Sequence, residues 1–473
     1  MISWDAARVA AAAGAQLAAG NAARGPARAA IDTRALQSGD LFVGLRGEHV
    51  DGGRFAADAL AAGAWGVLVA PEHAAGLAGG AVLVADDPLA ALQRLATAWR
   101  RELDADVIGV TGSVGKTSTK QLIAALLAPH RRVAANPANF NTEIGLPLAV
   151  LAAQEGTEVL VLEMGMRGFG QIDELARIAE PDVGVITLIG PVHLELVGDL
   201  AGVARAKGEL LAHVGVAVVP AGEAALEPYL RDVDVVSFGP AGDVVLEAFD
   251  PPHVTIRARE LRVELEVPFS ARHQLVNLLA AVAAVQAVGV EPGGRVDVDF
   301  GPLRGEIISL PNGVTVINDC YNANPLSMRA ALDDLATYEP PGRRVAVLGD
   351  MLELGPSERA DHREIGEYAN ASGVDVLVAA GPLSEEMAAS FSGETHRAAD
   401  AREAAAQAVE LVRSGDVVLV KASRGIGLET VAEALRGASS PGGAGASSPG
   451  GAGAPTPPGA STPRAGTEAP RRG

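Results

Sequence analysis

One stretch constrains the fold of this chain more than any other: residues 107–130, VIGVTGSVGKTSTKQLIAALLAPH. It opens with a short apolar run that is typical of a buried strand. Apolar residues from Leu122 to Leu127 then recur at helical spacing until Pro129 ends the pattern. Two glycines lie between these elements, where they would let the backbone turn sharply. The stretch therefore predicts an α/β unit in which a strand leads through a glycine turn into a helix.

The glycine turn has the residues of a phosphate cradle. Glycines let backbone N–H groups converge on an anion, and the helix N-terminus adds its dipole. Lys116 would reach the outer phosphates of a nucleotide, and the Thr117 hydroxyl would hold Mg²⁺. The strict pattern GxxxxGK[ST] would require a glycine at Val110, so only TGxxGKT is met, and a plain glycine turn is the alternative. The expected nucleotide-binding residues of this loop are Gly112, Ser113, Gly115, Lys116, Thr117 and Ser118.

Composition limits the class of protein. The chain has 473 residues, long enough for about three domains. A net charge of −20 with no basic face argues against a nucleic-acid partner, and no apolar run is long enough for a membrane span. Cys320 is the only cysteine, which fits a reducing compartment, and the N-terminus lacks the apolar core of a signal peptide. We therefore expect a cytoplasmic protein that acts as a monomer.

Lysine is rare in this chain. Lysine and arginine total 38 residues, but only four of them are lysines. A general bias toward arginine explains the scarcity, although it does not explain where the remaining lysines lie. An amine, unlike a guanidinium, is a compact charge that can lose its proton and react. Two lysines belong to the phosphate loop and its helix, so the other two are candidates for specific roles; the four are Lys116, Lys120, Lys207 and Lys421.

Residues 1 to about 104 are expected to form a small α/β unit. We predict a helix from Ile2 to Leu17, and short buried strands at 41–43, 65–69 and 81–84. A polar stretch between these elements is either a turn-rich connector or a pocket for a polar ligand. The candidate residues of that pocket are Asp32, Thr33 and Arg34.

Two further α/β units and a tail follow. Residues 105–310 alternate buried strands with helices, as in a parallel sheet, and then change to an antiparallel pattern at 244–269. Residues 311–437 return to alternating strands and helices, with Asn324 and Pro325 as a helix start. Residues 438–473 repeat ASSPGGAG and contain no core-forming pattern, so we expect this tail to be disordered.

Three polar residues of the middle unit could surround the phosphates. Glu163 ends one predicted strand and His193 follows the next, so both would lie at the carboxyl edge of the sheet, where ligands gather. They could bind magnesium, although each alone could equally be a capping or internally bonded polar residue. Lys207 follows in the same unit. A free ammonium would repel magnesium, so Lys207 would fit beside the metal only if its amine were modified; a carbamate, the product of lysine and CO₂, would supply two anionic oxygens.

A set of motifs resembles the Mur ligase superfamily of bacterial peptidoglycan synthesis, which includes folylpolyglutamate synthases. The resemblance covers residues 1 to about 437. It implies three domains: a first that binds the UDP end of a nucleotide-sugar peptide, a central P-loop domain, and a Rossmann-like C-terminal domain. The motifs are TGSVGKTSTK at 111–120, NFNTEIGLP at 139–147, EMG at 163–165, HLE at 193–195, AKGE at 206–209, ARHQLVN at 271–277, DCYNANPLSM at 319–328, LGDMLELG at 348–355 and VKASRG at 420–425.

The resemblance also implies a role for each matching residue. Lys116, Glu163, His193 and Lys207 match the catalytic residues, with Thr117 among the magnesium ligands and a carbamate on Lys207 holding a second ion. Asn277, Arg304 and Asp319 match contacts to ATP. Expected substrate contacts are Asp32, Thr33 and Arg34 at the uridine end, Asn139, Asn141 and Thr142 along the substrate, and Tyr321, Asn322 and Asn324 in the last domain. The chain departs from the family pattern at Gly53, Leu188 and Ala422.

The resemblance implies an ATP-dependent amide ligase that acts through an acyl phosphate. YNANP at 321–325 favours the branch that adds D-alanyl-D-alanine to UDP-N-acetylmuramoyl-tripeptide. One alternative is the ligase that adds a diamino acid one step earlier, although its DNPR-type motif is absent from the sequence. Another is a non-catalytic regulator that uses ATP as a switch. The sequence does not distinguish diaminopimelate from lysine at the third peptide position.

Overall fold

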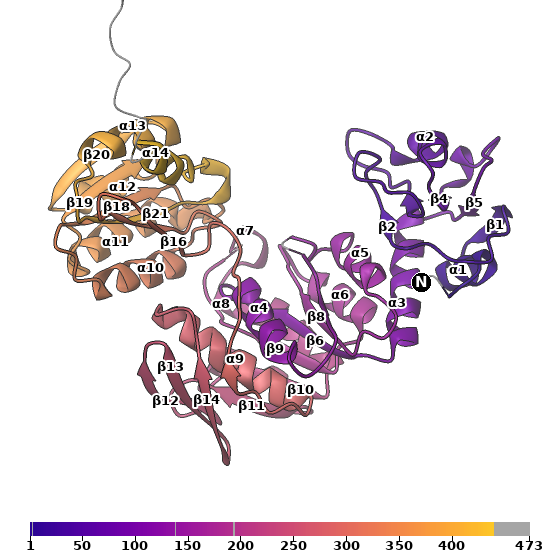
Figure 1. The fold of residues 1–473 in the computed structure, drawn as a ribbon, viewed down its shortest axis with the longest axis horizontal. Coiled ribbons are helices and arrows are strands. Elements are labelled where there is room, and N and C mark those ends of the chain that lie inside the picture. Colours follow the sequence, from indigo (N-terminus) through magenta and orange to yellow (C-terminus); the bar gives the residue numbers. More distant parts are fainter. Residues whose placement is uncertain (2, 138, 193, 439–473) are drawn as a thin grey trace, which may run out of the picture.

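The computed structural model describes residues 1, 3–137, 139–192 and 194–438. These residues form three α/β domains, each built on one sheet. The first domain lies at one end of the molecule, the third at the other, and the middle domain joins them (Figure 1). Among the described residues, no helix is both long enough and apolar enough to cross a membrane. The tail expected at 438–473 lies outside the described residues from position 439 onward.

The first domain is a five-stranded sheet in the order β1-β5-β4-β3-β2, parallel except at β1. The helix expected from Ile2 to Leu17 is shorter than predicted. It ends at Gly14, which takes up a left-handed conformation, and Leu17 belongs to a strand that pairs with β5. The elements are α1 (Ala6–Ala13), β1 (Gln16–Ala19), β2 (Ala29–Ala30), β3 (Leu41–Val43), α2 (Ala56–Ala61), β4 (Gly66–Val69), β5 (Ala81–Val84) and α3 (Pro88–Leu103).

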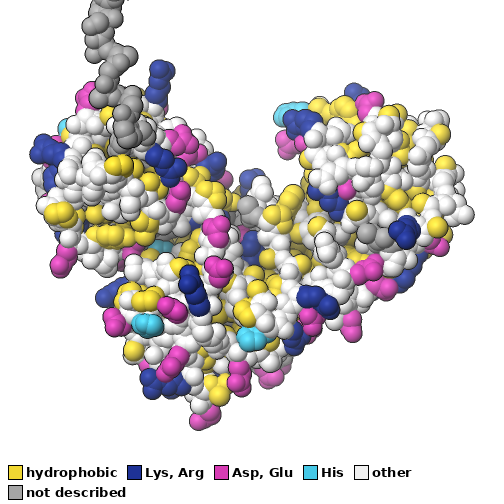
Figure 2. Space-filling model, in the orientation of Figure 1, with side chains coloured by type: hydrophobic (Ala, Val, Ile, Leu, Met, Phe, Trp, Pro, Cys, Tyr) yellow, Lys and Arg dark blue, Asp and Glu magenta, His cyan; other side chains and the backbone are white. Residues whose placement is uncertain are grey.

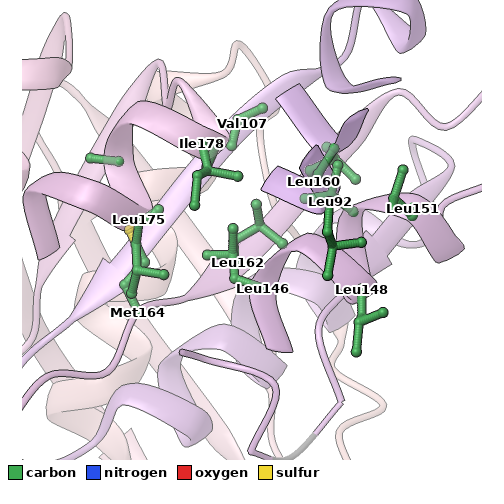
Figure 3. Packing of buried hydrophobic residues seen from close by; sticks show 14 of the residues in the cluster. Leu92, Val107, Leu146, Leu148, Leu151, Leu160, Leu162, Met164, Leu175 and Ile178 are labelled. Atoms are coloured by element: carbon green, nitrogen blue, oxygen red, sulfur yellow. The ribbon is translucent and has the colours of Figure 1, made fainter. Parts of the chain in front are cut away.

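Helix α3 packs the first domain onto the middle domain. Its buried face belongs to one hydrophobic core that continues into the middle domain. Figure 3 shows Leu92 of α3 among Leu146, Leu160 and Leu162. The indole N–H of Trp99 donates to the Ala153 carbonyl at 3.0 Å. Because one continuous core spans both domains, we expect them to behave as a single rigid unit.

The middle domain contains a ten-stranded sheet in the order β15-β14-β13-β12-β11-β10-β9-β6-β8-β7. Strands β6 to β12 run parallel. Strands β12, β13 and β14 are joined antiparallel, as the alternating pattern at 244–269 predicted. The elements are β6 (Asp106–Thr111), α4 (Lys116–Leu127), β7 (Val133–Ala135), α5 (Gly145–Ala152), β8 (Val159–Glu163), α6 (Gln171–Ala179), β9 (Val183–Ile186), α7 (Leu194–Val197), α8 (Leu200–Gly208), β10 (Val216–Pro220), β11 (Asp234–Phe238), β12 (Val244–Asp250), β13 (His253–Ala258), β14 (Leu261–Glu266), α9 (Arg272–Ala287) and β15 (Gly294–Arg295).

The third domain has a six-stranded sheet in the order β16-β17-β21-β18-β19-β20, parallel except at β16. Strand β16 precedes the boundary expected at 310, so the third sheet begins a few residues earlier than predicted. The elements are β16 (Glu306–Ser309), β17 (Thr315–Asn318), α10 (Pro325–Thr337), β18 (Arg344–Gly349), α11 (Glu358–Ala371), β19 (Val376–Ala380), α12 (Glu385–Ser390), β20 (Glu394–Ala398), α13 (Ala401–Leu411), β21 (Val417–Lys421) and α14 (Thr430–Ala438).

Candidate active site

The phosphate loop lies at the carboxyl end of β6, between the neighbouring strands β8 and β9. It passes directly into α4, which begins at Lys116. Gly115 has φ +84°, and a Cβ there would lie 2.3 Å from the Asn277 Oδ1, so only glycine fits. The Lys116 ammonium folds back over the loop and donates to the Gly112 carbonyl at 2.8 Å. The strand, turn and helix predicted from the sequence are therefore present, with the loop amide groups at the start of a helix.

Residues 187–190, which follow β9 in the middle domain, support the phosphate loop through hydrogen bonds. The Thr187 hydroxyl, just after β9, donates to the Val114 carbonyl at 2.5 Å. The Ser113 backbone N–H donates to the Leu188 carbonyl at 2.8 Å. The Ser113 hydroxyl donates to the Gly190 carbonyl and accepts from the Gly190 N–H, both at 2.9 Å. These contacts bind the loop to residues 187–190, and Ser113 therefore supports the loop through its side chain.

Glu163 ends β8 beside the loop and is 3% exposed. Its Oε2 accepts from the Thr117 hydroxyl at 2.7 Å, and its Oε1 accepts from the Asn141 amide at 2.9 Å. The structure thus brings together a carboxylate and a hydroxyl that were both predicted as magnesium ligands. Oxygen donors of this kind suit that cation. Asn141, predicted to face the substrate, orients this carboxylate.

Two buried residues that the sequence analysis did not select hold this arrangement. The Lys120 ammonium donates to the Asn136 carbonyl at 2.5 Å and lies 3.8 Å from the Glu163 carboxylate. The Asn136 amide accepts from the Glu163 backbone N–H and donates to the backbone carbonyls of Glu163 and Phe140. The Asn136 side chain therefore links the end of β8 to the loop at 139–142 through hydrogen bonds. Asn136 did not stand out in the sequence, because a single asparagine carries no spacing signal, and Lys120 stood out only as one of four lysines.

Lys207, on α8, is 2% exposed. Burial lowers the pKa of Lys207 well below its ordinary value, and the positive charge of Lys116 adds to this effect. His193, predicted as a magnesium ligand, lies outside the described residues.

The third domain contributes a second set of charged groups from the carboxyl ends of its neighbouring strands β17 and β21. The Lys421 ammonium, 2% exposed, lies 2.6 Å from the Asp319 Oδ2 and donates to the Asn322 carbonyl at 2.9 Å. The guanidinium of Arg304 stacks on the Tyr321 ring, 3.5 Å from its centroid. Lys421 thereby fixes the backbone of residues 319–322, where ATP and substrate contacts were predicted.

Residues from both domains line one cavity. A space of about 330 Å³ is lined by residues of the phosphate loop and by residues of the third domain. Figure 2 shows that the molecule is also hollowed between its first and third domains, above the middle domain. The residues that line this cavity include Ser113, Lys116, Tyr321, Asn322, Asn324 and Arg424.

Asn277 lies in α9, where its side chain meets the phosphate loop at Gly115. Its amide donates to the Gln274 Oε1 at 3.0 Å, so a second buried amide orients it. The predicted adenine-side residue is thus adjacent to the loop. Asn324 differs, since its side chain accepts from the Ser327 N–H at 2.9 Å and caps α10. That oxygen is already used inside the domain.

The uridine-side residues lie apart from this cluster, in the first domain. Asp32 pairs with Arg34 at 2.7 Å, and this contact lowers the pKa of Asp32 to about 2. The Arg34 side chain is 89% exposed.

Gly53 is a departure from the family pattern. A Cβ added there would lie 2.1 Å from the His73 ring, which is hydrogen-bonded to Asp51 at 2.9 Å. His73 thus fills the space beside Gly53.

Of the remaining predicted substrate contacts, Asn139 and Thr142 are exposed on the loop that follows Asn136. The Thr142 hydroxyl accepts from the Gly145 N–H at 3.3 Å at the start of α5. Ser118 is buried in the first turn of α4. Of the predicted site residues, Ser113, Lys116, Tyr321, Asn322 and Asn324 line one cavity between the middle and third domains, and Asp32, Thr33 and Arg34 lie in the first domain.

Fold and site together define a three-domain α/β protein with a glycine loop of the phosphate-binding type beside a buried carboxylate. Comparison with protein families makes the class specific. The Mur ligase middle domain matches residues 110–285, the Mur ligase glutamate ligase domain matches residues 303–424, and the Mur ligase family catalytic domain matches residues 29–100. The chain belongs to the Mur ligase family, which confirms both the resemblance and the expected architecture.

Curated relatives and solved structures resemble the chain along most of its length. It is 38% identical to UDP-N-acetylmuramoyl-tripeptide–D-alanyl-D-alanine ligase of Bacillus subtilis, covering 86% of this chain and 92% of that protein. The ligase of the same name from Escherichia coli is 33% identical, with 86% and 92% covered. MurF from Acinetobacter baumannii superposes with a TM-score of 0.82 at 28% identity, covering 92% and 98%. MurF from Thermotoga maritima in complex with ADP gives 0.75 at 30% identity, covering 86% and 97%.

Proposed function

We propose that this protein is the ATP-dependent ligase that joins D-alanyl-D-alanine to UDP-N-acetylmuramoyl-tripeptide in peptidoglycan precursor synthesis. One observation carries the proposal: the phosphate loop and the segment at 321–324 line the same cavity. A nucleotide on the loop would therefore face an amine held by the third domain. The relatives that carry the name of this reaction match the chain along most of its length. The same reading implies a cytoplasmic enzyme, which we propose to be a monomer.

The residues present suit magnesium. The Glu163 carboxylate and Thr117 hydroxyl converge at 2.7 Å in a buried pocket beside the loop, and His193 follows the next strand in sequence. Bound there, magnesium would neutralise charge on the transferring phosphoryl group. Lys207 suits a carbamate, because its amine is buried beside the positive charge of Lys116 and its pKa is lowered, which favours the neutral amine that CO₂ requires. In that reaction the Nζ attacks CO₂, an N–C bond forms and one proton is released.

The reaction needs two displacements. The terminal carboxylate of the tripeptide attacks the γ-phosphorus of ATP, and ADP leaves with the electron pair of the broken bond. The amine of the dipeptide then attacks the acyl carbon, phosphate leaves and the nitrogen loses a proton. Lys116 and the loop N–H groups stabilise the charge that develops in the first step. Enclosure between the middle and third domains protects the acyl phosphate from water.

Each domain has a task in this scheme. Asp32, Thr33 and Arg34 hold the uridine end in the first domain, and Asn139, Asn141 and Thr142 border the path to Glu163. Ser118, Asn277, Arg304 and Asp319 serve ATP. In the third domain, Tyr321 and Asn322 receive the dipeptide, with Asn324 shaping the turn.

An amine-selectivity assay tests the proposal. The protein is incubated with ATP, Mg²⁺ and UDP-N-acetylmuramoyl-tripeptide, and with D-alanyl-D-alanine, free D-alanine or a diamino acid. We expect ADP and a new amide only with the dipeptide, because a site built for one amine leaves polar groups unpaired with another. Turnover of a diamino acid on the dipeptide-stage precursor would instead assign the chain to the preceding ligase. ATP binding without any amide would favour a regulator.

A further inference from the structure

Leu326 joins the third domain to the middle domain at one point. It follows Pro325 in the first turn of α10, directly after the segment at 321–324. A Cβ added to Gly190 would lie 2.0 Å from the Leu326 Cδ1, which is too close for any two carbon atoms. The absence of a side chain at Gly190 therefore leaves a notch in the middle domain, and Leu326 fills it.

The notch belongs to the support of the phosphate loop. Gly190 is buried and exchanges two hydrogen bonds with the Ser113 hydroxyl, both at 2.9 Å. The Ser113 N–H is bonded to Leu188 on the same segment. Apart from Leu326, the nearest atom to an added Cβ at Gly190 is the Ser113 Cβ, at 3.7 Å. Leu326 therefore contacts a backbone segment that moves only together with the loop.

On its own side, Leu326 belongs to an equally well-held segment. Asn324 and Ser327 form a capping box that fixes the first turn of α10. Lys421 donates to the Asn322 carbonyl at 2.9 Å, and the Ser423 hydroxyl donates to the Ala323 carbonyl at 3.3 Å. The segment at 322–326 is thus held to the third sheet, and a shift of Leu326 would move residues 322–324 with it.

We propose that Leu326 and Gly190 are positioning residues that set the distance between the amine-binding segment and the phosphate loop while the third domain is docked on the middle domain. This inference rests on the proposed function, because it assigns residues 321–324 to the dipeptide. The contact couples the two sites: a nucleotide that orders the loop also orders the surface on which Leu326 rests. Such coupling is reciprocal, so dipeptide binding strengthens nucleotide binding by the same factor.

A double-mutant cycle tests the contact. We compare wild type with G190A, L326A and the double variant, and measure KM for the dipeptide and for ATP. In G190A the new methyl and Leu326 cannot both occupy the notch, so KM for the dipeptide should rise about fivefold or more. KM for ATP, measured at saturating dipeptide, should rise by a similar factor, because the coupling is reciprocal. In the Leu326→Ala background, the same Gly190→Ala change should have little effect, since the competing side chain is absent.

G293A is the matched control, because a Cβ at Gly293 meets no atom within 4 Å and Gly293 has an ordinary φ. It should leave both KM values unchanged. As a readout independent of turnover, calorimetry measures ADP affinity with and without dipeptide. The ratio of the affinity with dipeptide to the affinity without it should be larger in wild type than in L326A. Additive effects in the cycle, or an unchanged ratio, would overturn the inference while leaving the ligase assignment intact. A wild-type protein that forms no amide would instead remove the proposed function on which the inference rests.

Discussion

Lysine side chains in this protein serve the cleft and its supports. Lys120, Lys207 and Lys421 are only 2–3% exposed, and Lys116 is folded over the phosphate loop. A buried guanidinium would keep its charge, whereas a buried amine can be neutral. Burial lowers the pKa of Lys116, Lys120 and Lys207 alike. The four lysines that the sequence retains are therefore concentrated in the middle and third domains, and three of them are buried.

Lys116→Ala tests the phosphate loop. The ammonium donates its hydrogen bonds to the loop carbonyls of Gly112 and Ser113, so its loss should leave the fold intact. We expect amide formation to fall by at least about 100-fold, the cost of losing one preorganised charge stabiliser. Thermal unfolding monitored by circular dichroism checks that the variant is folded. Ligase activity near the wild-type level would disprove the assignment.

Lys207→Arg tests the carbamate, because a guanidinium keeps its positive charge and does not add CO₂. We expect this variant and Lys207→Ala to be nearly inactive. A small carboxylate added in solution should partly restore Lys207→Ala by occupying the vacated oxygen positions. Carbon-13 NMR of wild type with labelled CO₂ should show a carbamate signal that is absent from both variants. A fully active Lys207→Arg protein would exclude the modification.

Asp334 should make the third domain sensitive to pH. Burial, with a smaller contribution from Asp319, raises the pKa of Asp334 to about 6 from a value of 3.8, and its buried Oδ1 lacks a partner among the described residues. The folded state therefore holds the proton more tightly than the unfolded chain. The stability contributed by this proton is complete below about pH 4 and is lost as pH rises through about 6.

Asp334→Asn should remove this loss. We expect urea unfolding to show the variant about 1–3 kcal/mol more stable than wild type at pH 7 and nearly equal at pH 4. Glu260→Gln, a change at an exposed hairpin residue, is the control and should show no such pH dependence. Equal stability of Asp334→Asn and wild type at both pH values would contradict the elevated pKa.

Single residues show the limits of what the sequence could predict about the site. The loop, Glu163 and Lys207 were predictable because each belongs to a motif or follows an apolar strand. The supports Asn136 and Gly190 were not, since their roles depend on contacts between segments far apart in the chain. The Asn324 side chain was predicted both as a helix cap and as a substrate contact, and the structure uses its oxygen for the cap.

At the scale of elements, buried strands were predictable and edge strands were not. Strands β6, β8, β9, β18, β19 and β21 are apolar runs buried on both faces, so their pattern is continuous. Strand β20, Glu394–Ala398, pairs on one side only and is largely polar, so hydrophobicity gave no signal. Strand β7, at one edge of the middle sheet, is apolar but only three residues long, which is too short to show a strand pattern.

Asn324 allows the cap and the substrate role to be separated. Asn324→Ala removes the capping oxygen of α10 and should cost about 1 kcal/mol of stability. Asn324→Asp keeps an oxygen that can accept from the Ser327 N–H, so its stability should be close to wild type. If the amide group also contacts the dipeptide, Asn324→Asp should raise KM for the dipeptide while its melting temperature is retained. Equal melting temperatures for both variants would rule out the cap as a stabilising element.

At the scale of the whole molecule, the two domain junctions differ in kind. The first and middle domains share one hydrophobic core through α3, in which Trp4 and Trp99 meet edge to face. The third domain meets the middle domain at separate points, such as Leu326 on Gly190 and Glu195 beside Gly355. A continuous core resists relative motion, whereas a small divided interface permits it. The open cavity between middle and third domains lies at the second junction.

We therefore expect substrates to move the third domain against a rigid pair formed by the first two.

A labelling experiment tests this expectation. The native thiol will not interfere, because Cys320 is buried and burial raises its pKa, which leaves it unreactive. Cysteines introduced at exposed positions as A62C, E260C and E410C place one label in each domain. Fluorescence transfer is then measured in doubly substituted proteins, with and without a non-hydrolysable ATP analogue and UDP-N-acetylmuramoyl-tripeptide. The pair at 62 and 260 should be unchanged, and both pairs that include 410 should change, since closure over the acyl phosphate requires the third domain to approach. A shift between 62 and 260, or no change at 410, would show that the junctions do not differ as their packing implies.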